Sequence, residues 1–153
     1  MPVSVRRANE RDIDRIVEFN LAMARESEDK GLNPETLRAG VAAVLAEPAN
    51  GFYLMAEADG RPVGSLMVTT EWSDWRNGRF WWIQSVFVAP EHRRQGIYSR
   101  LHDSVRRAAQ ADGQCCGLRL YVEKRNIGAQ AAYASLGMTP THYDLFEEEF
   151  GAG

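Results

Sequence analysis

Apolar and polar positions alternate at the start of the chain and then switch to a helical period. Residues 3–7 alternate as in a short strand. After Asn9, a residue type that caps helices, apolar side chains recur at helical spacing, and Asn33 and Pro34 begin a second amphipathic segment that Pro48 closes. The apolar positions are Ile13, Ile16, Val17 and Met23 in the first segment and Leu37, Val41, Val44 and Leu45 in the second. The pattern predicts a strand followed by two helices.

From residue 51 the period becomes that of strands. Residues 52–58 and 63–70 are rich in aromatic and β-branched side chains, and the dipeptide Asp59-Gly60 between them is a hairpin signal. A third strand is expected over residues 79–89, after a turn-rich loop. These three segments predict antiparallel strands at the centre of a sheet.

The remaining residues return to an alternation of helices and strands. A helix is expected over residues 96–112, and strands and helices then follow as strand 117–122, helix 126–136 and last strand 138–150. The predicted inner face of the 96–112 helix consists of Ile97, Leu101, Val105 and Ala108. The segments of the chain therefore follow the order βααβββαβαβ.

This order places the chain in the α/β class, as an α+β mixed sheet. A strand–helix–strand passage within a mostly antiparallel set implies a mixed sheet with helices on both faces. No linker, repeat or low-complexity tract interrupts the pattern. We expect residues 1–150 to form a single domain and residues 151–153 to be a frayed tail.

Composition and net charge limit the classes of function that this chain can have. The 153 residues are 44% hydrophobic and 25% charged, which is typical of a globular domain with its own core. The formal net charge of -3 disfavours a general electrostatic grip on nucleic acid or on an anionic membrane. With no apolar run long enough to cross a bilayer and no apolar stretch at the start, we expect a cytoplasmic protein.

Metal chemistry is not indicated by the cysteines and histidines. Cys115 and Cys116 are adjacent, which suits neither a disulfide framework nor a metal-ligand pattern. The histidines, His92, His102 and His142, show no zinc-ligand spacing. We therefore expect no metal cofactor.

The segment with the clearest chemistry lies between the 79–89 strand and the 96–112 helix. It consists of Arg93, Arg94, Gln95, Gly96, Ile97, Tyr98 and Ser99. Backbone N–H groups at a helix start lack intrahelical partners and attract phosphate, and a glycine allows close approach of an oxyanion. Neither a Walker loop nor a dinucleotide fingerprint is present. Taken alone, the pattern leaves open a solvated turn.

Two segments, in the same order along the chain as in the family, resemble the GNAT N-acetyltransferases. The resemblance covers nearly the whole chain. Residues 86–98 resemble the acetyl-CoA segment of the family, a strand followed by Arg/Gln-x-x-Gly-x-Gly/Ala, in which Arg93 and Gly96 match and Tyr98 departs from the usual Gly or Ala. The second segment follows the next strand and carries Asn126, Ala129, Tyr133 and the run Leu136-Gly137-Met138.

The resemblance implies a fold and a cofactor site. In the family a bulged fourth strand splays from the fifth, and its free backbone groups hold the pantetheine arm of acetyl-CoA like an added strand. Here that backbone belongs to Val86, Phe87 and Val88, and the diphosphate would reach the loop from Arg94 to Ser99. Arg93 is also an expected cofactor-binding residue. Asn126 and Ala129 are further expected cofactor-binding residues. Acetyl-CoA is thus the expected co-substrate.

The resemblance also implies acetyl transfer from the thioester to a primary amine, by direct attack in a ternary complex. Tyr133 matches the family's tyrosine, whose phenol donates a proton to the leaving thiolate. The general base stays open: Glu71 is the nearest candidate, Glu28, His142 and Tyr143 are others, and a water relay is an alternative. Trp72, Trp75 and Asp74 are candidates for a wall beside the acceptor.

The acceptor amine, on a small molecule or a peptide, is not identified by these residues. A non-catalytic acyl-CoA-binding module is the main alternative function. A nucleic-acid binder using the arginines of the 96–112 helix is a second, which the acidic total disfavours. The last strand, as a free edge, suggests a possible homodimer.

Overall fold

The computed structural model describes residues 2–151, which form two compact units, one ending at Leu120 and one beginning at Tyr121. We describe each unit by itself. The first contains all of the strands and three of the four α-helices in the described residues. The prediction of a single domain over residues 1–150 stays a prediction, and Ala152 and Gly153 of the expected tail lie outside the described residues.

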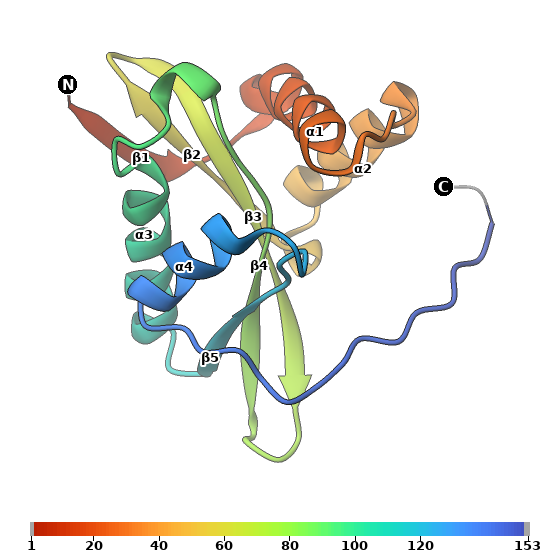
Figure 1. The fold of residues 1–153 in the computed structure, drawn as a ribbon, viewed down its shortest axis with the longest axis vertical. Coiled ribbons are helices and arrows are strands. Elements are labelled where there is room, and N and C mark those ends of the chain that lie inside the picture. The colour runs from red at the N-terminus through yellow and green to blue at the C-terminus, as the bar shows by residue number, and fades with distance from the viewer. Residues whose placement is uncertain (1, 152–153) are drawn as a thin grey trace. The chain divides into compact units, whose positions relative to one another are not determined.

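The first unit is built on a five-stranded sheet in the order β1-β2-β3-β4-β5 (Figure 1). The strands are β1 (Val3–Arg7), β2 (Phe52–Ala58), β3 (Arg61–Ser73), β4 (Gly78–Val88) and β5 (Cys115–Leu120). Each of the first four is antiparallel to its neighbour, whereas β4 and β5 are parallel. The predicted mixed sheet is confirmed.

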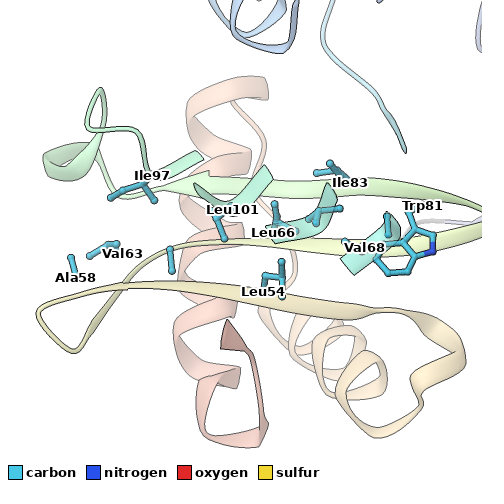
Figure 2. Close-up of a cluster of buried hydrophobic side chains, with 12 residues drawn as sticks. Leu54, Ala58, Val63, Leu66, Val68, Trp81, Ile83, Ile97 and Leu101 are labelled. Carbon is cyan, nitrogen blue, oxygen red and sulfur yellow. The ribbon is translucent and has the colours of Figure 1, made fainter. Parts of the chain in front are cut away.

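Helices cover both faces of this sheet, as predicted. The helices are α1 (Ile13–Glu28), α2 (Pro34–Ala46) and α3 (Ile97–Ala111). On one face α1 and α2 pack over Tyr53, Met55 and Phe87. On the other face α3 packs over a second cluster, which includes Leu66 and Ile83 (Figure 2). No helix in the part of the chain that the structure describes is long and apolar enough to cross a membrane.

The local signals in the sequence explain most of these elements. Asn33 caps α2 by accepting from the N–H groups of Glu35 and Thr36. Asp59 and Gly60 take positive φ angles of 52° and 76°, as the tight hairpin between β2 and β3 requires. Asn9 caps a 3-10 turn that leads into α1, so the helix itself begins at Ile13 instead of directly after the cap.

Two predictions about elements are wrong. Residues 138–150, predicted as the last strand, pair with no strand among the described residues, so the order βααβββαβαβ lacks its final member. A strand needs a ladder partner, and alternating side chains alone do not supply one. In α3 the inner position is Ala109, not Ala108, because four residues after the buried Val105 the helix returns to the core face.

The second unit contains one α-helix, α4 (Ile127–Ser135), followed by a segment without regular structure. Asn126 caps α4, since its side-chain oxygen accepts from the Ala129 N–H at 3.1 Å. Beyond the helix, Tyr143, Leu145, Phe146 and Phe150 are exposed. The homodimer suggested by this segment stays a prediction.

Candidate functional site

Strand β4 carries a bulge at the position where the sequence places the cofactor arm. Met67 of β3 faces Gln84, but Ser65 faces Phe87, so β4 contains one residue more than β3 over this interval. Ser85 takes the left-handed conformation, with φ 52°. A residue in that conformation is the local signature of a bulge, and the predicted bulge in the fourth strand is confirmed.

The bulge resets which side chains face which core. Trp81 and Ile83, before the bulge, are buried on the α3 side, and Val86 and Val88, after it, pack on that same side. Phe87 is buried in the cluster beneath α1 and α2. Strict alternation from Ile83 would have sent Val86 and Val88 to the opposite face. Side chains on both faces thus fix the backbone of 86–88.

The ladder between β4 and β5 ends just before the bulge. Its last pair in the described residues is Ile83 with Leu120, where β5 ends, while β4 continues to Val88. On its other edge the end of β4 stays paired with β3, through Gly64 and Ser65. A β4 edge without a ladder partner has backbone groups that an extended ligand arm can bind.

The loop between β4 and α3 turns through two left-handed residues. Arg94 has φ 62° and Gly96 has φ 79°, and Gly96 is the N-cap of α3. Arg100 N–H donates to the carbonyl of Gly96, so the amides of the preceding turn are those that a helix start leaves without intrahelical acceptors. Apart from the residues adjacent to Gly96 in the chain, no atom of residues 2–151 lies within 4 Å of an added Cβ at Gly96. This space suits an oxyanion such as a diphosphate.

Arg93 is held by three groups of the protein. Its Nε donates to the Val88 carbonyl at 2.8 Å, and its two terminal nitrogens donate to both oxygens of Glu26, at 2.9 and 2.7 Å. The guanidinium also lies 5.3 Å from the centroid of the Phe87 ring. Hydrogen bonding to Arg93 lowers the pKa of Glu26, so this carboxylate is ionised at neutral pH.

The other residues of the loop have distinct surroundings. Ile97 is buried in the α3 core, and the Gln95 amide donates to the Glu91 carbonyl at 3.3 Å. Arg94 and Ser99 are exposed. Tyr98, the departure from the family pattern, is partly buried, and its hydroxyl lies 3.0 Å from Nδ1 of His102.

His102 is fully buried on α3, between Tyr98 and Arg106. Nε2 of its ring lies 3.2 Å from a terminal nitrogen of Arg106, so with an Arg as donor this ring nitrogen is the acceptor. Burial is the main cause that lowers the pKa of His102, and the nearby positive charge of Arg106 lowers it further. The imidazole is therefore neutral at neutral pH, and its Nδ1–H is directed to the Tyr98 oxygen.

Glu71 lies on β3, opposite Phe80, and its carboxylate is oriented by two donors. One oxygen, Oε1, accepts from the Trp82 indole at 3.1 Å and from Arg119 at 2.9 Å. The Arg119 guanidinium stacks 3.6 Å from the centroid of the Phe80 ring. The Glu71 side chain is 49% exposed. Both of these donors bind Oε1, so neither of them occupies the second oxygen, Oε2.

Asn126, Ala129 and Tyr133 belong to the second unit. Asn126 and Ala129 are joined by the helix cap, and Tyr133 is partly buried on α4. Burial raises the pKa of Tyr133, which keeps its phenol protonated at neutral pH. His142 and Tyr143, the other acid–base candidates of this unit, contact each other with ring centroids 4.3 Å apart.

The structure thus brings Val86, Phe87 and Val88 together with residues 93–99 at one end of β4. Glu71 lies elsewhere on the sheet, opposite Phe80 in the part of β4 that pairs with both β3 and β5. The sequence alone did not predict the contacts of Glu26, Arg119 and His102. Glu26 and Arg119 bind residues that are distant in the sequence and are brought close only by the fold. Only His102 had a signal, its i+4 spacing from Tyr98 on a helix.

A model of the acetyltransferase (GNAT) family matches residues 13–138. A cattle (Bos taurus) protein, thialysine N-epsilon-acetyltransferase, is 32% identical over 96% of this chain and 88% of its own.

Two solved structures show the same fold. A possible acetyltransferase from Clostridium difficile 630 is 41% identical, covers 99% of this chain and 100% of its own, and has a TM-score of 0.91. A predicted acetyltransferase from Clostridium acetobutylicum, solved with acetyl-CoA, is 18% identical over 96% of each chain, with a TM-score of 0.79.

Proposed function

Because this chain belongs to the acetyltransferase (GNAT) family, we propose that it transfers the acetyl group of acetyl-CoA to a primary amine of a small molecule or peptide. Membership makes it an acetyl-CoA-dependent N-acetyltransferase. The proposal concerns the acceptor class and the residues that carry the reaction. The observation that supports it best is the bulge at Ser85, because it holds the free edge of β4 next to the start of α3.

The residues at this edge fit acetyl-CoA. The backbone of Val86–Val88 would bind the pantetheine arm as a strand would, and the amides after Gly96 would bind the diphosphate. The open space at Gly96 allows the phosphate oxygens to approach the backbone closely. When bound, acetyl-CoA supplies the thioester carbonyl that the amine attacks.

The reaction needs a proton donor for the thiolate and a path for the proton of the amine. Tyr133 is the proposed donor, since its raised pKa keeps the phenol protonated at neutral pH. A primary amine has a reference pKa of about 10.4, so the acceptor must lose a proton before it attacks. Glu71 through Oε2, or a chain of water molecules, would take that proton.

The similarity to a thialysine N-epsilon-acetyltransferase favours a small acceptor with a side-chain amine. The experiment is a panel of amines that includes lysine, thialysine, polyamines, aminoglycosides and peptides, with release of free CoA thiol as the readout. We expect turnover with at least one amine and binding of acetyl-CoA by calorimetry. Binding without turnover across the panel would instead favour a non-catalytic acyl-CoA-binding module.

Replacing Tyr133 tests the proton donor. Tyr133→Phe removes the hydroxyl and keeps the ring, so we expect kcat to fall by about tenfold to a hundredfold with little change in the KM for acetyl-CoA. Steady-state kinetics with the best amine provides the measurement. Tyr121→Phe is the matched control, because it removes a phenol from an exposed position of the same unit that is not one of the acid–base candidates. Equal kcat in wild type and Tyr133→Phe would assign the donor to another group.

A further inference from the structure

Arg93 matches a family position that the resemblance assigns to cofactor binding. In the structure, however, its side chain binds groups of the protein itself. All three of its nitrogens donate, to the Val88 carbonyl and to the two Glu26 oxygens. Its charge is therefore neutralised by a carboxylate, and three of its five N–H groups are used. Such a guanidinium is a poor ligand for a diphosphate.

The same contacts join three segments that surround the candidate site. Val88 is the last residue of β4, Glu26 lies in the last turn of α1, and Arg93 precedes the left-handed Arg94 and Gly96. Phe87 beneath the guanidinium packs against Phe19 of α1, with ring centroids 5.2 Å apart. The Arg93 contacts thus extend the α1–β4 packing to the loop that starts α3.

We propose that Arg93 is a positioning residue, which with Glu26 holds the β4–α3 loop against the end of α1 in the conformation that binds acetyl-CoA. The inference rests on the proposed function. An isolated ion pair at this exposure contributes little, since the Arg93 and Glu26 side chains are 42% and 45% exposed. Here the bidentate geometry and the bond to the Val88 carbonyl give the pair a defined orientation.

Glu26→Gln separates the two roles by the sign of its effect. If Arg93 positions the loop, the variant weakens the anchor, and the dissociation constant for CoA rises by about threefold to tenfold. If Arg93 binds phosphate directly, removal of the competing carboxylate leaves CoA binding unchanged or makes it tighter. Titration calorimetry with CoA measures this without turnover, and that second result overturns the inference.

Two further variants complete the experiment. Glu18→Gln is the matched control, because Glu18 is an exposed carboxylate on α1 that pairs with Arg15 at 3.2 Å, and we expect wild-type affinity. Arg93→Lys keeps a positive charge but cannot make the three-way contact, so we expect weaker CoA binding, as in Glu26→Gln. Wild-type affinity in Arg93→Lys would overturn the inference.

Kinetics and thermal unfolding distinguish positioning from general stability. We expect Glu26→Gln to raise the KM for acetyl-CoA, to leave kcat nearly unchanged, and to unfold within about 2 °C of Glu18→Gln. A lower unfolding temperature with an unchanged KM would show a merely structural contact and overturn the inference. Absence of CoA binding by the wild type would overturn the proposed function itself, whereas wild-type binding with an unaffected Glu26→Gln overturns the inference alone.

Discussion

Single residues with unusual backbone conformations shape the candidate site. Ser85, Arg94 and Gly96 all have positive φ, and all lie between the middle of β4 and the start of α3. For residues other than glycine this conformation costs about 1–2 kcal/mol. Ser85 and Arg94 therefore need the surrounding contacts to hold them, and Gly96 takes the same region of conformational space without a Cβ.

Gly96→Val tests the phosphate site at this scale. The new side chain occupies the open space beside the α3 amides, so we expect the dissociation constant for CoA to rise at least about tenfold while the domain stays folded. Calorimetry and circular dichroism measure the two effects.

Gly113→Val is the matched control for that variant. Gly113 also has positive φ, 47°, and open space around it, but it follows the other end of α3. Both variants carry similar backbone strain, and only Gly96→Val is expected to lose CoA affinity. Equal losses would mean that strain, not the blocked approach of phosphate, weakens binding.

Among the elements, β4 connects every part of the candidate site in the first unit. One end pairs with β3 and β5 and carries Trp82, which orients Glu71. The other end, past the bulge, pairs with β3 alone and leads into the loop before α3. A change along this strand therefore affects the cofactor end and the Glu71 end differently.

Glu71→Gln tests the general base at the level of the sheet. The amide keeps an oxygen for Trp82 and Arg119 but cannot accept a proton, so we expect the acidic limb of the pH–rate profile to flatten. The profile of kcat/KM between pH 5 and 9 provides the measurement. Glu18→Gln, which changes an exposed, ion-paired carboxylate on α1 in the same way, is the control. An unaltered limb in Glu71→Gln would favour the water relay.

Element boundaries in the first unit were largely predictable, because burial and turn chemistry leave local signals. The strand over residues 52–58 follows from its composition and from the Asp59-Gly60 turn after it. The final strand was not predictable, since alternation at 138–150 carries no information about a partner. For the site, the bulge came from the family resemblance, while the Glu26–Arg93 pair joins residues 67 positions apart and has no local signature.

In the first unit, an ion-pair network joins β1, the turn before α1 and β2. Arg6 on β1 donates to both oxygens of the buried Asp12, at 2.8 and 2.9 Å, and to Glu57 on β2 at 3.1 Å. Asp12 also accepts from the Asn9 N–H at 2.8 Å. These hydrogen bonds, chiefly those from Arg6, lower the pKa of Asp12.

Asp12→Asn is expected to reduce the free energy of unfolding by about 2 kcal/mol, less than for a fully buried pair because the Arg6 side chain is 36% exposed. Since the folded pKa of Asp12 lies below its unfolded value, its contribution is complete above about pH 4 and is lost as pH falls through the folded pKa. Urea unfolding at pH 7 and at pH 3 measures both effects, and the variant should resemble the wild type more closely at pH 3.

Asp14→Asn is the control for the network. Asp14 pairs with Arg38 of α2, but its side chain is 78% exposed, so we expect little change in stability. Equal losses in the two variants would show that net charge, not the buried network, sets the acid sensitivity.

The valines and the phenylalanine after Ser85 have a consequence for how such proteins vary. A ligand that binds backbone amides does not depend on the side chains of those residues. The hydrophobic cores on the two faces of the sheet therefore determine which substitutions are tolerated at Val86, Phe87 and Val88. In the proposed site, the stretch that recognises the cofactor therefore has a sequence like that of any buried strand. Relatives that share the chemistry can diverge freely there, provided that hydrophobic character and the one-residue offset are retained.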